Sequence, residues 1–541
     1  MNIITVQLQD YYQHKVFETV IARRHWSRFE SRLRRNVDKT LGLLERHGVK
    51  ATFFALGWIA ERFPEIIQDI HNQGHEIASA GFWGADRRAV TQTEFREDMR
   101  LGKDTLEEII GTRVDGYRSI RRSFSETDLW MIDLVSEEGY RYDSSLMPSG
   151  IRRTWGVDAR RPFVRETRRG PISELPHSTA NLLGVRVPVG GGNFLRQLPT
   201  HYTFRAFKSW TRTNNAPFML YFHPWELDGE LPDVSAFGPL TRVRQYRNLG
   251  KLEHILPRYL EAAPFGSARD YLELDRRDTP EQAVRSASQS VVVHRRTGND
   301  RVPVTVVIPC YNEEAAVVFL SRTLNELTVA AEPDYDLHYV LVDDRSTDDT
   351  VRMLRDAFAD SPRHTVLELP ANVGVSGAIH AGIREAQTEI VCSIDADCSY
   401  DPLELLKMIP LLDTNTAMVT ASPYHEEGAV LGVPEWRLFL SRGLSRIYHR
   451  LMTHKFATYT SCFRVYRRSA VLRFRPQYTD FRGIVELLAL MDIAGENIKE
   501  FPTTLQSRIF GISKMRTIRT IRDHVGLLAQ IARRKRQALH G

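Results

Sequence analysis

Cysteine is scarce in this chain of 541 residues, which carries only Cys310, Cys392, Cys398 and Cys462. None of them stands in a CxxC pair, so the sequence indicates neither a zinc site nor a disulfide framework, and it fits a reducing compartment. Long apolar runs are also missing: no stretch of about 18 apolar residues predicts a membrane span, and no basic start before an apolar segment predicts a signal peptide. We therefore expect a cytoplasmic protein, with a peripheral place on the inner face of the plasma membrane as a further option.

Positive charge is in small excess, and the formal net charge is +6. Much of it is local, because the stretch from Arg508 to Gly541 holds nine Lys or Arg and one acid, Asp523. A basic end of this kind can face anionic lipid, phosphate groups or nucleic acid. Apart from Phe510 it has no aromatic residue, and the chain has no nucleic-acid motif, so we expect no nucleic-acid partner.

The last part of this basic end, residues 515–539, interleaves apolar residues with Arg and Lys. Two interpretations stay open: an interfacial helix on anionic lipid, or an ordinary helix packed on its domain.

The first half of the chain alternates strand and helix patterns. The expected strands are 3–8, 51–56, 76–79 and 219–222, and the expected helices are 31–47, 64–73, 93–110 and 129–138. This order favours parallel strands in a barrel or a doubly wound sheet. Residues 276–301 are polar, rich in Ser and Arg and without a sustained period, and we interpret them as a linker between a domain over 1–275 and a second over 302–541.

A second strand–helix series follows the linker. Its expected strands are 304–308, 339–342, 365–369 and 390–394, and its expected helices are 313–327, 347–358 and 377–386. Polar motifs follow three of these strands, at 309–314, 343–348 and 395–397. Open α/β sheets bind ligands at the carboxyl ends of their strands, so these motifs are expected to share one site.

The last motif places two carboxylates one residue apart, in Asp395 and Asp397. Both can approach one divalent cation together with phosphate oxygens. Aspartates at the second strand end, Asp343 and Asp344, can hydrogen-bond a base or a ribose. One such acid is usually a solvated loop residue or a helix cap, but three motifs in this order indicate a site.

The strings VVIPCYNEE, LVDDRSTDDT, NVGVSGAIHAGI and DADCSYDP resemble family-two glycosyltransferases with the GT-A fold, above all the dolichyl- or polyprenyl-phosphate sugar synthases. The resemblance implies a Rossmann-like α/β/α domain, a nucleotide-sugar donor, and Mg²⁺ or Mn²⁺ held by Asp395 and Asp397, with Asp397 the more direct ligand and catalytic. The implied nucleotide pocket also includes Pro309, Tyr311, Glu313, Asp343, Asp344, Asn372 and Gly374.

The segment Pro434-Glu435-Trp436-Arg437, with Ser441 and Arg442, resembles the part of the synthases that binds the acceptor phosphate. The residues that match later motifs are Arg464, Glu486, Arg508, Ser513 and Lys514. Arg437, Arg508 and Lys514 would supply positive charge to a lipid phosphate or a departing diphosphate. A phosphate acceptor is already anionic, whereas a sugar hydroxyl needs a base. Glu486 and Asp480 are both candidates for that base, and the sequence does not choose between them.

The first half contains TVQLQDYYQ, VKATFFALGWIAERFPEII, GHEIASAG and LYFHPWELD. These strings resemble polysaccharide deacetylases of the NodB-homology type, in the group associated with exopolysaccharide export. The resemblance implies a distorted (β/α) barrel in which one Asp and two His hold a metal that activates water.

Several ligand positions of that family are changed here. Gln7 and Gln9 stand where acids are expected, and Ala80 and Gly84 stand where the two His are expected, which leaves Asp10 alone. One ligand of three does not hold a catalytic metal, so we expect no metal and no deacetylation in this domain.

Other deacetylase-type residues persist in the first half, and Arg118 and His223 with Trp225 keep a cleft that can bind a glycan or a partner. We interpret His75 as structural. The alternative is that His75 or Asp86 rebuilds a site.

These patterns together predict an inverting, nucleotide-sugar-dependent glycosyltransferase fused to a deacetylase-like domain. Its expected acceptor is a polyprenyl-phosphate lipid or a growing polysaccharide. A bifunctional enzyme that also deacetylates N-acetyl sugars and a non-catalytic scaffold for polysaccharide assembly are the alternatives. Ala80 and Gly84 argue against the first alternative, and the intact Asp395-Ala396-Asp397 argues against the second.

Overall fold

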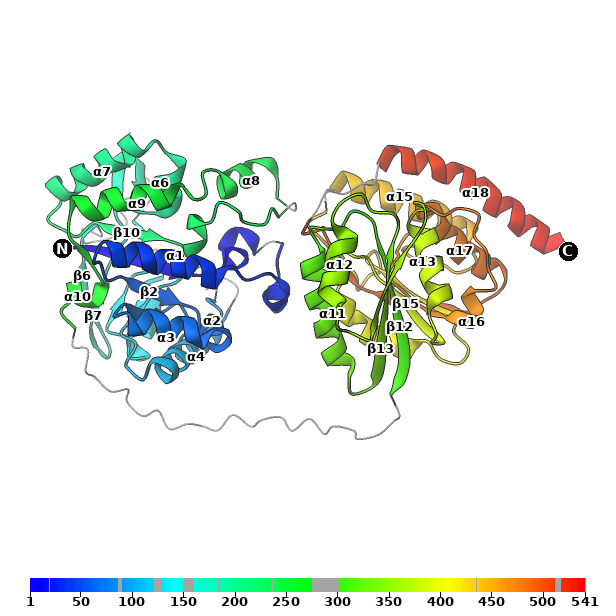
Figure 1. The fold of residues 1–541 in the computed structure, drawn as a ribbon, viewed down its shortest axis with the longest axis horizontal. Helices are drawn as coiled ribbons and strands as arrows, with labels where there is room; N and C mark the ends of the chain where they lie inside the picture. Colours follow the sequence, from blue (N-terminus) through cyan, green and yellow to red (C-terminus); the bar gives the residue numbers. More distant parts are fainter. Residues whose placement is uncertain are drawn as a thin grey trace. The chain divides into compact units, whose positions relative to one another are not determined.

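The computed structural model describes residues 1–18, 20–85, 90–120, 124, 128–148, 160–182, 185–234, 237–274, 301–433, 435–510 and 517–540. The chain forms two compact units (Figure 1). The first comprises Met1–Glu18, Ser31–Pro232 and Gly238–Ser288, and the second comprises Thr19–Glu30, Asp233–Phe237 and Gln289–Gly541. The predicted linker, apart from Arg301, lies outside the described residues.

The first unit is built on a mainly parallel sheet with the order β10-β1-β2-β3-β4-β5-β7-β6, and β11 also pairs with β1. Its strands are β1 (Asn2–Leu8), β2 (Thr52–Ala55), β3 (Glu76–Ser79), β4 (Gly116–Tyr117), β5 (Tyr142–Asp143), β6 (Phe163–Thr167), β7 (Gly170–Glu174), β10 (Met219–Phe222) and β11 (Phe265–Gly266). Every residue of β1 is buried, as expected for a central strand covered on both faces. A separate hairpin pairs β8 (Thr179–Leu182) with β9 (Val185–Pro188).

Helices alternate with these strands. They are α1 (Leu33–Arg46), α2 (Gly57–Arg62), α3 (Pro64–Asn72), α4 (Gln92–Ile110), α5 (Leu129–Glu137), α6 (Gly192–Gln197), α7 (Thr200–Thr213), α8 (Pro239–Tyr246), α9 (Lys251–Ala262) and α10 (Ala268–Tyr271). The boundaries of α4 follow from local chemistry, because Thr91 and Glu94 form a capping box and Gly111 ends the helix at a φ of 67°. The alternation confirms the predicted distorted (β/α)-barrel type of fold.

The second unit contains a seven-stranded sheet with the order β14-β13-β12-β15-β18-β16-β19. Its strands are β12 (Val302–Cys310), β13 (Tyr335–Asp343), β14 (His364–Glu368), β15 (Ile390–Ser393), β16 (Met418–Ser422), β18 (Arg464–Arg467) and β19 (Ile498–Pro502). β14, β13, β12 and β15 are parallel, whereas β18 runs antiparallel to both of its neighbours. A short ladder pairs β17 (Ala429–Leu431) with β20 (Thr504–Gln506).

Two hydrophobic clusters cover the faces of this sheet. Along β12, Val306 and Ile308 belong to one cluster and Val307 to the other, which is the period of two expected for a strand. Figure 1 shows α11 (Val317–Ala331) and α12 (Thr350–Phe358) on one side of the sheet, and α13 (Val375–Glu385) and α17 (Phe481–Ile493) on the other. This arrangement confirms the predicted α/β/α domain.

One predicted helix begins later than the sequence pattern suggested. The pattern gave a helix from residue 313, but α11 begins at Val317. Asn312 adopts a left-handed conformation with φ 51°, and the backbone N–H of Glu313 donates to Thr350 Oγ1 at 2.7 Å. The intervening residues therefore form a loop at the strand end, where the site lies.

A segment from the first half of the sequence belongs to the second unit. Within it, Arg28 is 2% exposed and donates to Glu326 at 2.8 Å and to Asp401 at 2.9 Å. His25 Nε2 lies 3.2 Å from the same Asp401 carboxylate. The ring of Phe29 packs against Phe319 and Phe510. No sequence pattern predicted this placement.

The basic end of the chain forms α18 (Thr517–His540), which packs against α17 and α15 (Glu435–Leu451). Leu527 and Ile531 of α18 are buried in the core. This packing supports the interpretation of an ordinary packed helix over that of an interfacial helix. Among the residues that the structure describes, no helix is both long and apolar enough to cross a membrane.

Candidate active site

Three acids and one arginine meet at the carboxyl ends of β12 and β15. Arg508 Nε donates to Asp397 Oδ2 at 2.7 Å, and its Nη2 donates to Glu313 Oε1 at 2.9 Å. Asp395 stands two residues before Asp397, and its carboxyl lies near enough to feel the charges of Asp397, Arg508 and Glu313. We call Glu313, Asp395 and Asp397 the acid cluster. Two of the three predicted motifs thus meet through Arg508, which follows β20.

The two aspartates of the acid cluster have different surroundings. Asp397 Oδ1 accepts hydrogen bonds from the backbone N–H of Ser399 at 2.9 Å and from its hydroxyl at 2.7 Å, while Arg508 holds Oδ2. Burial of the Asp395 carboxyl, followed by the negative charge of Asp397, raises the pKa of Asp395 to about 7. The site therefore concentrates negative charge that Arg508 alone does not neutralise.

The chemistry of the acid cluster fits a hard divalent cation. Carboxylate oxygens are the ligands that Mg²⁺ and Mn²⁺ prefer, and three carboxylates against one guanidinium leave an excess of negative charge. Within the described residues, no three His, Cys, Asp or Glu side chains are grouped so that they could hold a metal ion by themselves. A cation held by Asp395 and Asp397 would thus need further oxygen ligands from a substrate or water.

The motif after β13 organises the neighbouring loop. Asp344 Oδ1 and Oδ2 accept from the backbone N–H groups of Val373 and Gly374 at 2.6 and 2.8 Å. Asn372 donates from its side chain to the Asp344 carbonyl at 2.9 Å. Asp343 instead accepts from the backbone N–H of Ser346, at 3.1 Å for the nearer oxygen. The contacts of Asp344 bring three of the predicted nucleotide-pocket residues together, Asp344, Asn372 and Gly374, and Asp343 is the chain neighbour of Asp344.

Glycine is required at position 374. Its φ is 84°, and a Cβ there would lie 2.9 Å from the carbonyl oxygen of Thr479. The loop at 372–374 therefore lies directly against residues 479–480. Of the other predicted pocket residues, Pro309 lies in β12 and Tyr311, which follows it, is 38% exposed.

The two candidate bases have different settings. Glu486 is 2% exposed, and its Oε2 accepts from the backbone N–H groups of Gln477 and Tyr478 at 2.7 and 2.9 Å. Asp480 caps α17 and is bound through both oxygens by the side chain of Arg482. Partial burial by itself would raise the pKa of Asp480, but the hydrogen bonds from Arg482 outweigh it and lower this pKa below its usual value. Glu486 thus anchors a loop, and Asp480 is a weakened base.

The predicted acceptor residues are only partly brought together. Arg464 is completely buried and donates to Thr420 Oγ1, to the Ile484 carbonyl and to the Tyr459 carbonyl, so its contacts are those of a structural residue. Ser441 is half-buried on α15. Arg437 lies on the same helix, but its side chain is outside the described part, as are Ser513 and Lys514.

In the first unit, the residues at the expected metal-ligand positions are buried. Asp10 is 1% exposed, and its carboxylate accepts from Tyr11 N, Ser31 Oγ and Arg32 N. Burial raises the pKa of Asp10 to about 6 despite these bonds. Gln7, at the end of β1, is buried as well.

The positions expected to hold histidine cannot accept one without rearrangement. Ala80 is completely buried, and Gly84 has a φ of 62°. A Cβ on Gly84 would lie 2.6 Å from Ile120 Cδ1. His75 accepts from the Ala51 N–H at 3.1 Å, as expected for a structural role, and Asp86 lies outside the described residues.

Arg118 and His223 also have defined packing contacts. Arg118 is 1% exposed and donates to Thr5, Ser144 and the Met219 sulfur. Burial lowers its pKa to about 10. The ring of His223 lies against those of His14 and Trp225. Arg118 thus has a structural role, because its hydrogen bonds join residues on several sides of its buried guanidinium. The sequence did not predict this role.

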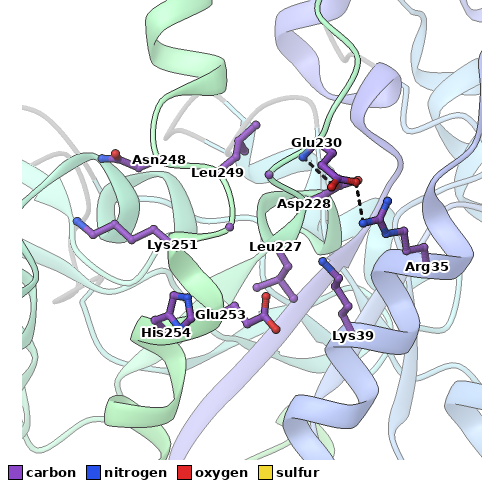
Figure 2. Close-up of a pocket in the computed structure, with 12 residues that line it drawn as sticks. Arg35, Lys39, Leu227, Asp228, Glu230, Asn248, Leu249, Lys251, Glu253 and His254 are labelled. Atoms are coloured by element: carbon purple, nitrogen blue, oxygen red, sulfur yellow. Dashed lines mark hydrogen bonds and ion pairs between the residues drawn. The ribbon is translucent and has the colours of Figure 1, made fainter.

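An open pocket of about 550 Å³ lies on the flank of the first unit, lined by residues of α1, α9 and the segment after His223 (Figure 2). Arg35 donates to Glu230 across its edge at 2.9 Å, and Lys39 points into the same space (Figure 2). Asp228 at its base pairs with Arg32, the residue whose N–H binds Asp10. None of the residues predicted from the sequence lines this pocket.

Comparisons with known protein families match different families to the two halves of the chain. Residues 305–474 match the family described as Glycosyl transferase family 2. Residues 22–142 match the family described as Polysaccharide deacetylase, and residues 144–273 match a domain of unknown function, DUF3473.

Individual relatives named as transferases match about two fifths of this chain. An uncharacterized glycosyltransferase of Mycobacterium bovis is 32% identical over 221 residues, which cover 39% of this chain and 89% of that protein. Undecaprenyl-phosphate 4-deoxy-4-formamido-L-arabinose transferase of Pectobacterium atrosepticum is 28% identical over 223 residues, covering 40% of this chain and 64% of that protein. The chain thus spans just under two thirds of the length of that transferase.

Among solved structures, glucosyl-3-phosphoglycerate synthase from Mycobacterium tuberculosis aligns with a TM-score of 0.34 and 18% identity, covering 43% of this chain and 79% of that one.

Proposed function

Because this chain belongs to glycosyl transferase family 2 and carries a polysaccharide deacetylase domain before its transferase half, we propose that it transfers a sugar from a nucleotide-sugar donor to a polyprenyl-phosphate lipid with inversion. The transfer is assigned to residues 302–541, with a deacetylase-like domain over 1–275 and a linker over 276–301. The printed name of the Pectobacterium relative, an undecaprenyl-phosphate transferase, supports a lipid phosphate as the acceptor class.

One observation carries the proposal: Arg508 joins Asp397 to Glu313 at the carboxyl ends of two neighbouring parallel strands. This edge of an open α/β sheet is where ligands bind. A nucleoside diphosphate placed there would meet the Arg508 guanidinium, which can neutralise charge on its phosphates as the glycosidic bond breaks. Mg²⁺ or Mn²⁺, when bound by Asp395 and Asp397, supplies additional positive charge for the same diphosphate.

The settings of the two candidate bases favour an acceptor that is already anionic. Glu486 is engaged with two backbone N–H groups, and Asp480 is held by Arg482 with a lowered pKa. Neither is well suited to take a proton from a sugar hydroxyl. A lipid phosphate needs no such base, so this chemistry supports a phosphate acceptor over a growing polysaccharide.

For the first unit we propose a catalytically inactive deacetylase-like domain that keeps a binding or structural role. Asp10 is engaged by three protein donors, and packing closes the Gly84 position. Release of acetate from an N-acetylated glycan by the full chain loaded with Zn²⁺, Co²⁺ or Ni²⁺ would overturn this part of the proposal.

The transfer is tested by a screen of nucleotide sugars with Mg²⁺ or Mn²⁺ and a polyprenyl phosphate. We expect turnover by the wild-type chain and a loss of at least about a hundredfold in Asp397→Ala, because the variant lacks a carboxylate that holds the cation which neutralises the diphosphate. Asp356→Ala is the matched control, since Asp356 is 68% exposed on α12. Equal turnover by Asp397→Ala and wild type would sink the assignment.

A further inference from the structure

Helix α15 exposes large apolar side chains to solvent. Phe439 is 75% exposed, Trp436 54% and Ile447 44%, and Leu431, shortly before the helix, is 51% exposed. Residues 436, 439, 443 and 447 follow helical spacing and share one face. Several large, exposed apolar side chains on one face of a helix indicate an interaction surface.

The opposite face of α15 already has its partner. Ser445 and Tyr448 are buried, and the Tyr448 hydroxyl lies 2.7 Å from His524 Nδ1 of α18. Leu444 packs at the edge of the same core. The helix is therefore fixed in its rotation, and the exposed aromatic face is not a core face that has failed to pack.

Positive charge accompanies the apolar face. The helix sequence EWRLFLSRGLSRIYHRL has four arginines against one glutamate. Arg442, Arg446 and Arg450 are exposed and four residues apart, so they form a row of like charges that repel one another. Among the described residues no acid forms an ion pair with Arg446 or Arg450. Such a row is stabilised by an external anionic surface.

The exposed face begins close to the acid cluster. Leu431 pairs with Gln506 in the β17–β20 ladder, and the Ser507 N–H donates to the Leu431 carbonyl at 2.9 Å. The next residue, Arg508, binds Asp397 and Glu313. A surface held by α15 and Leu431 is therefore connected by a short stretch of paired backbone to the proposed transfer site.

We propose that α15 with Leu431 is a membrane-docking surface for an anionic bilayer. Phe439, Trp436 and Ile447 enter the interface between headgroups and acyl chains, and Arg446 and Arg450 bind lipid phosphates. Docking in this way brings a lipid-phosphate acceptor to the acid cluster. This last step rests on the proposed function, whereas the docking itself does not.

The docking is tested by sedimentation of the full chain with phosphatidylcholine vesicles that contain or lack phosphatidylglycerol. We expect binding to the anionic vesicles that weakens with added salt. Arg446→Gln with Arg450→Gln should weaken it about fivefold per arginine, and Phe439→Ser with Ile447→Ser at least about tenfold. Unchanged binding by both double variants would overturn the proposal, as would failure of the wild type to bind anionic vesicles, which would assign the face to a protein partner.

Matched controls separate docking from general changes in surface polarity. Val329→Ser alters an apolar side chain on α11 that is 63% exposed, and Arg352→Gln with Arg355→Gln removes two exposed charges from α12. We expect vesicle binding by these variants to equal that of the wild type. An equal loss in the controls would show that no particular face is involved and would overturn the proposal.

Transfer assays distinguish this inference from the proposed function. With a water-soluble, short-chain prenyl phosphate, the Phe439→Ser/Ile447→Ser variant should turn over as the wild type does. With a long-chain polyprenyl phosphate in vesicles, it should lose most of its rate. If the wild type transfers to neither acceptor, the proposed function fails while the vesicle-binding result still decides the docking. Equal loss by the variant with both acceptors would overturn the docking role of this face.

Discussion

Replacing Arg508 by alanine tests the acid cluster directly. The guanidinium makes two charge-assisted hydrogen bonds, at 2.7 and 2.9 Å, and its side chain is 22% exposed. Each such bond contributes about 1.5–3 kcal/mol, and its loss also leaves three carboxylates without a neighbouring cation. We expect the second unit to lose about 3 kcal/mol of stability, which for a domain of this size lowers its Tm by about 6–12 °C.

The assay is calorimetry of the full chain with EDTA and then with Mn²⁺. Without a divalent cation, Arg508→Ala should unfold earlier than the wild type. Addition of Mn²⁺ should raise the Tm of the variant by more than it raises the Tm of the wild type, because the cation replaces the missing positive charge. Arg473→Ala is the control, since Arg473 is 60% exposed in its pair with Glu496 and should contribute at most about 1 kcal/mol.

Two results would refute this reasoning. Equal Tm values for Arg508→Ala and Arg473→Ala in EDTA would show that Arg508 does not hold the acid cluster together. An equal gain from Mn²⁺ in the wild type and in Arg508→Ala would show that the cluster does not attract a cation in proportion to its excess charge.

Three further predictions concern other parts of the chain. Gly374→Ala should weaken nucleotide binding at least about fivefold in calorimetric titration, because φ is 84° and the new Cβ meets the Thr479 carbonyl; Gly526→Ala, with open space around it, should leave affinity unchanged. Arg28→Ala should destabilise the second unit by about 3 kcal/mol in urea unfolding, because it removes a buried guanidinium that pairs with both Glu326 and the partly buried Asp401; a change confined to the first unit would contradict the placement of this segment. Burial, and then the charge of Lys50, lowers the pKa of His75 to about 4. As the pH falls, His75 is therefore protonated in the unfolded chain before it is protonated in the folded one, and the free energy of unfolding of the first unit decreases by about 2 kcal/mol between pH 7 and pH 5. His75→Gln should remove that slope, and an unchanged slope would assign the acid sensitivity elsewhere.

Two features could be predicted from the amino-acid sequence alone: the two α/β architectures and the edge of the sheet where the site lies. Strand and helix periods are local properties, and the carboxyl ends of parallel strands always share one edge, so motifs at 309–314 and 395–397 had to meet. The missing ligands at Ala80 and Gly84 are likewise a matter of residue identity, because neither side chain can bind a metal in any fold.

The partner of each charged side chain, in contrast, became evident only from the packing of the folded chain. Arg508 lies far along the chain from both Glu313 and Asp397, yet it joins them. Arg464 and Glu486 matched site motifs, but packing surrounds them with backbone groups that use their hydrogen bonds. Burial and pairing depend on long-range packing that no local period encodes, and for that reason the sequence indicated the site while the fold assigned its individual contacts.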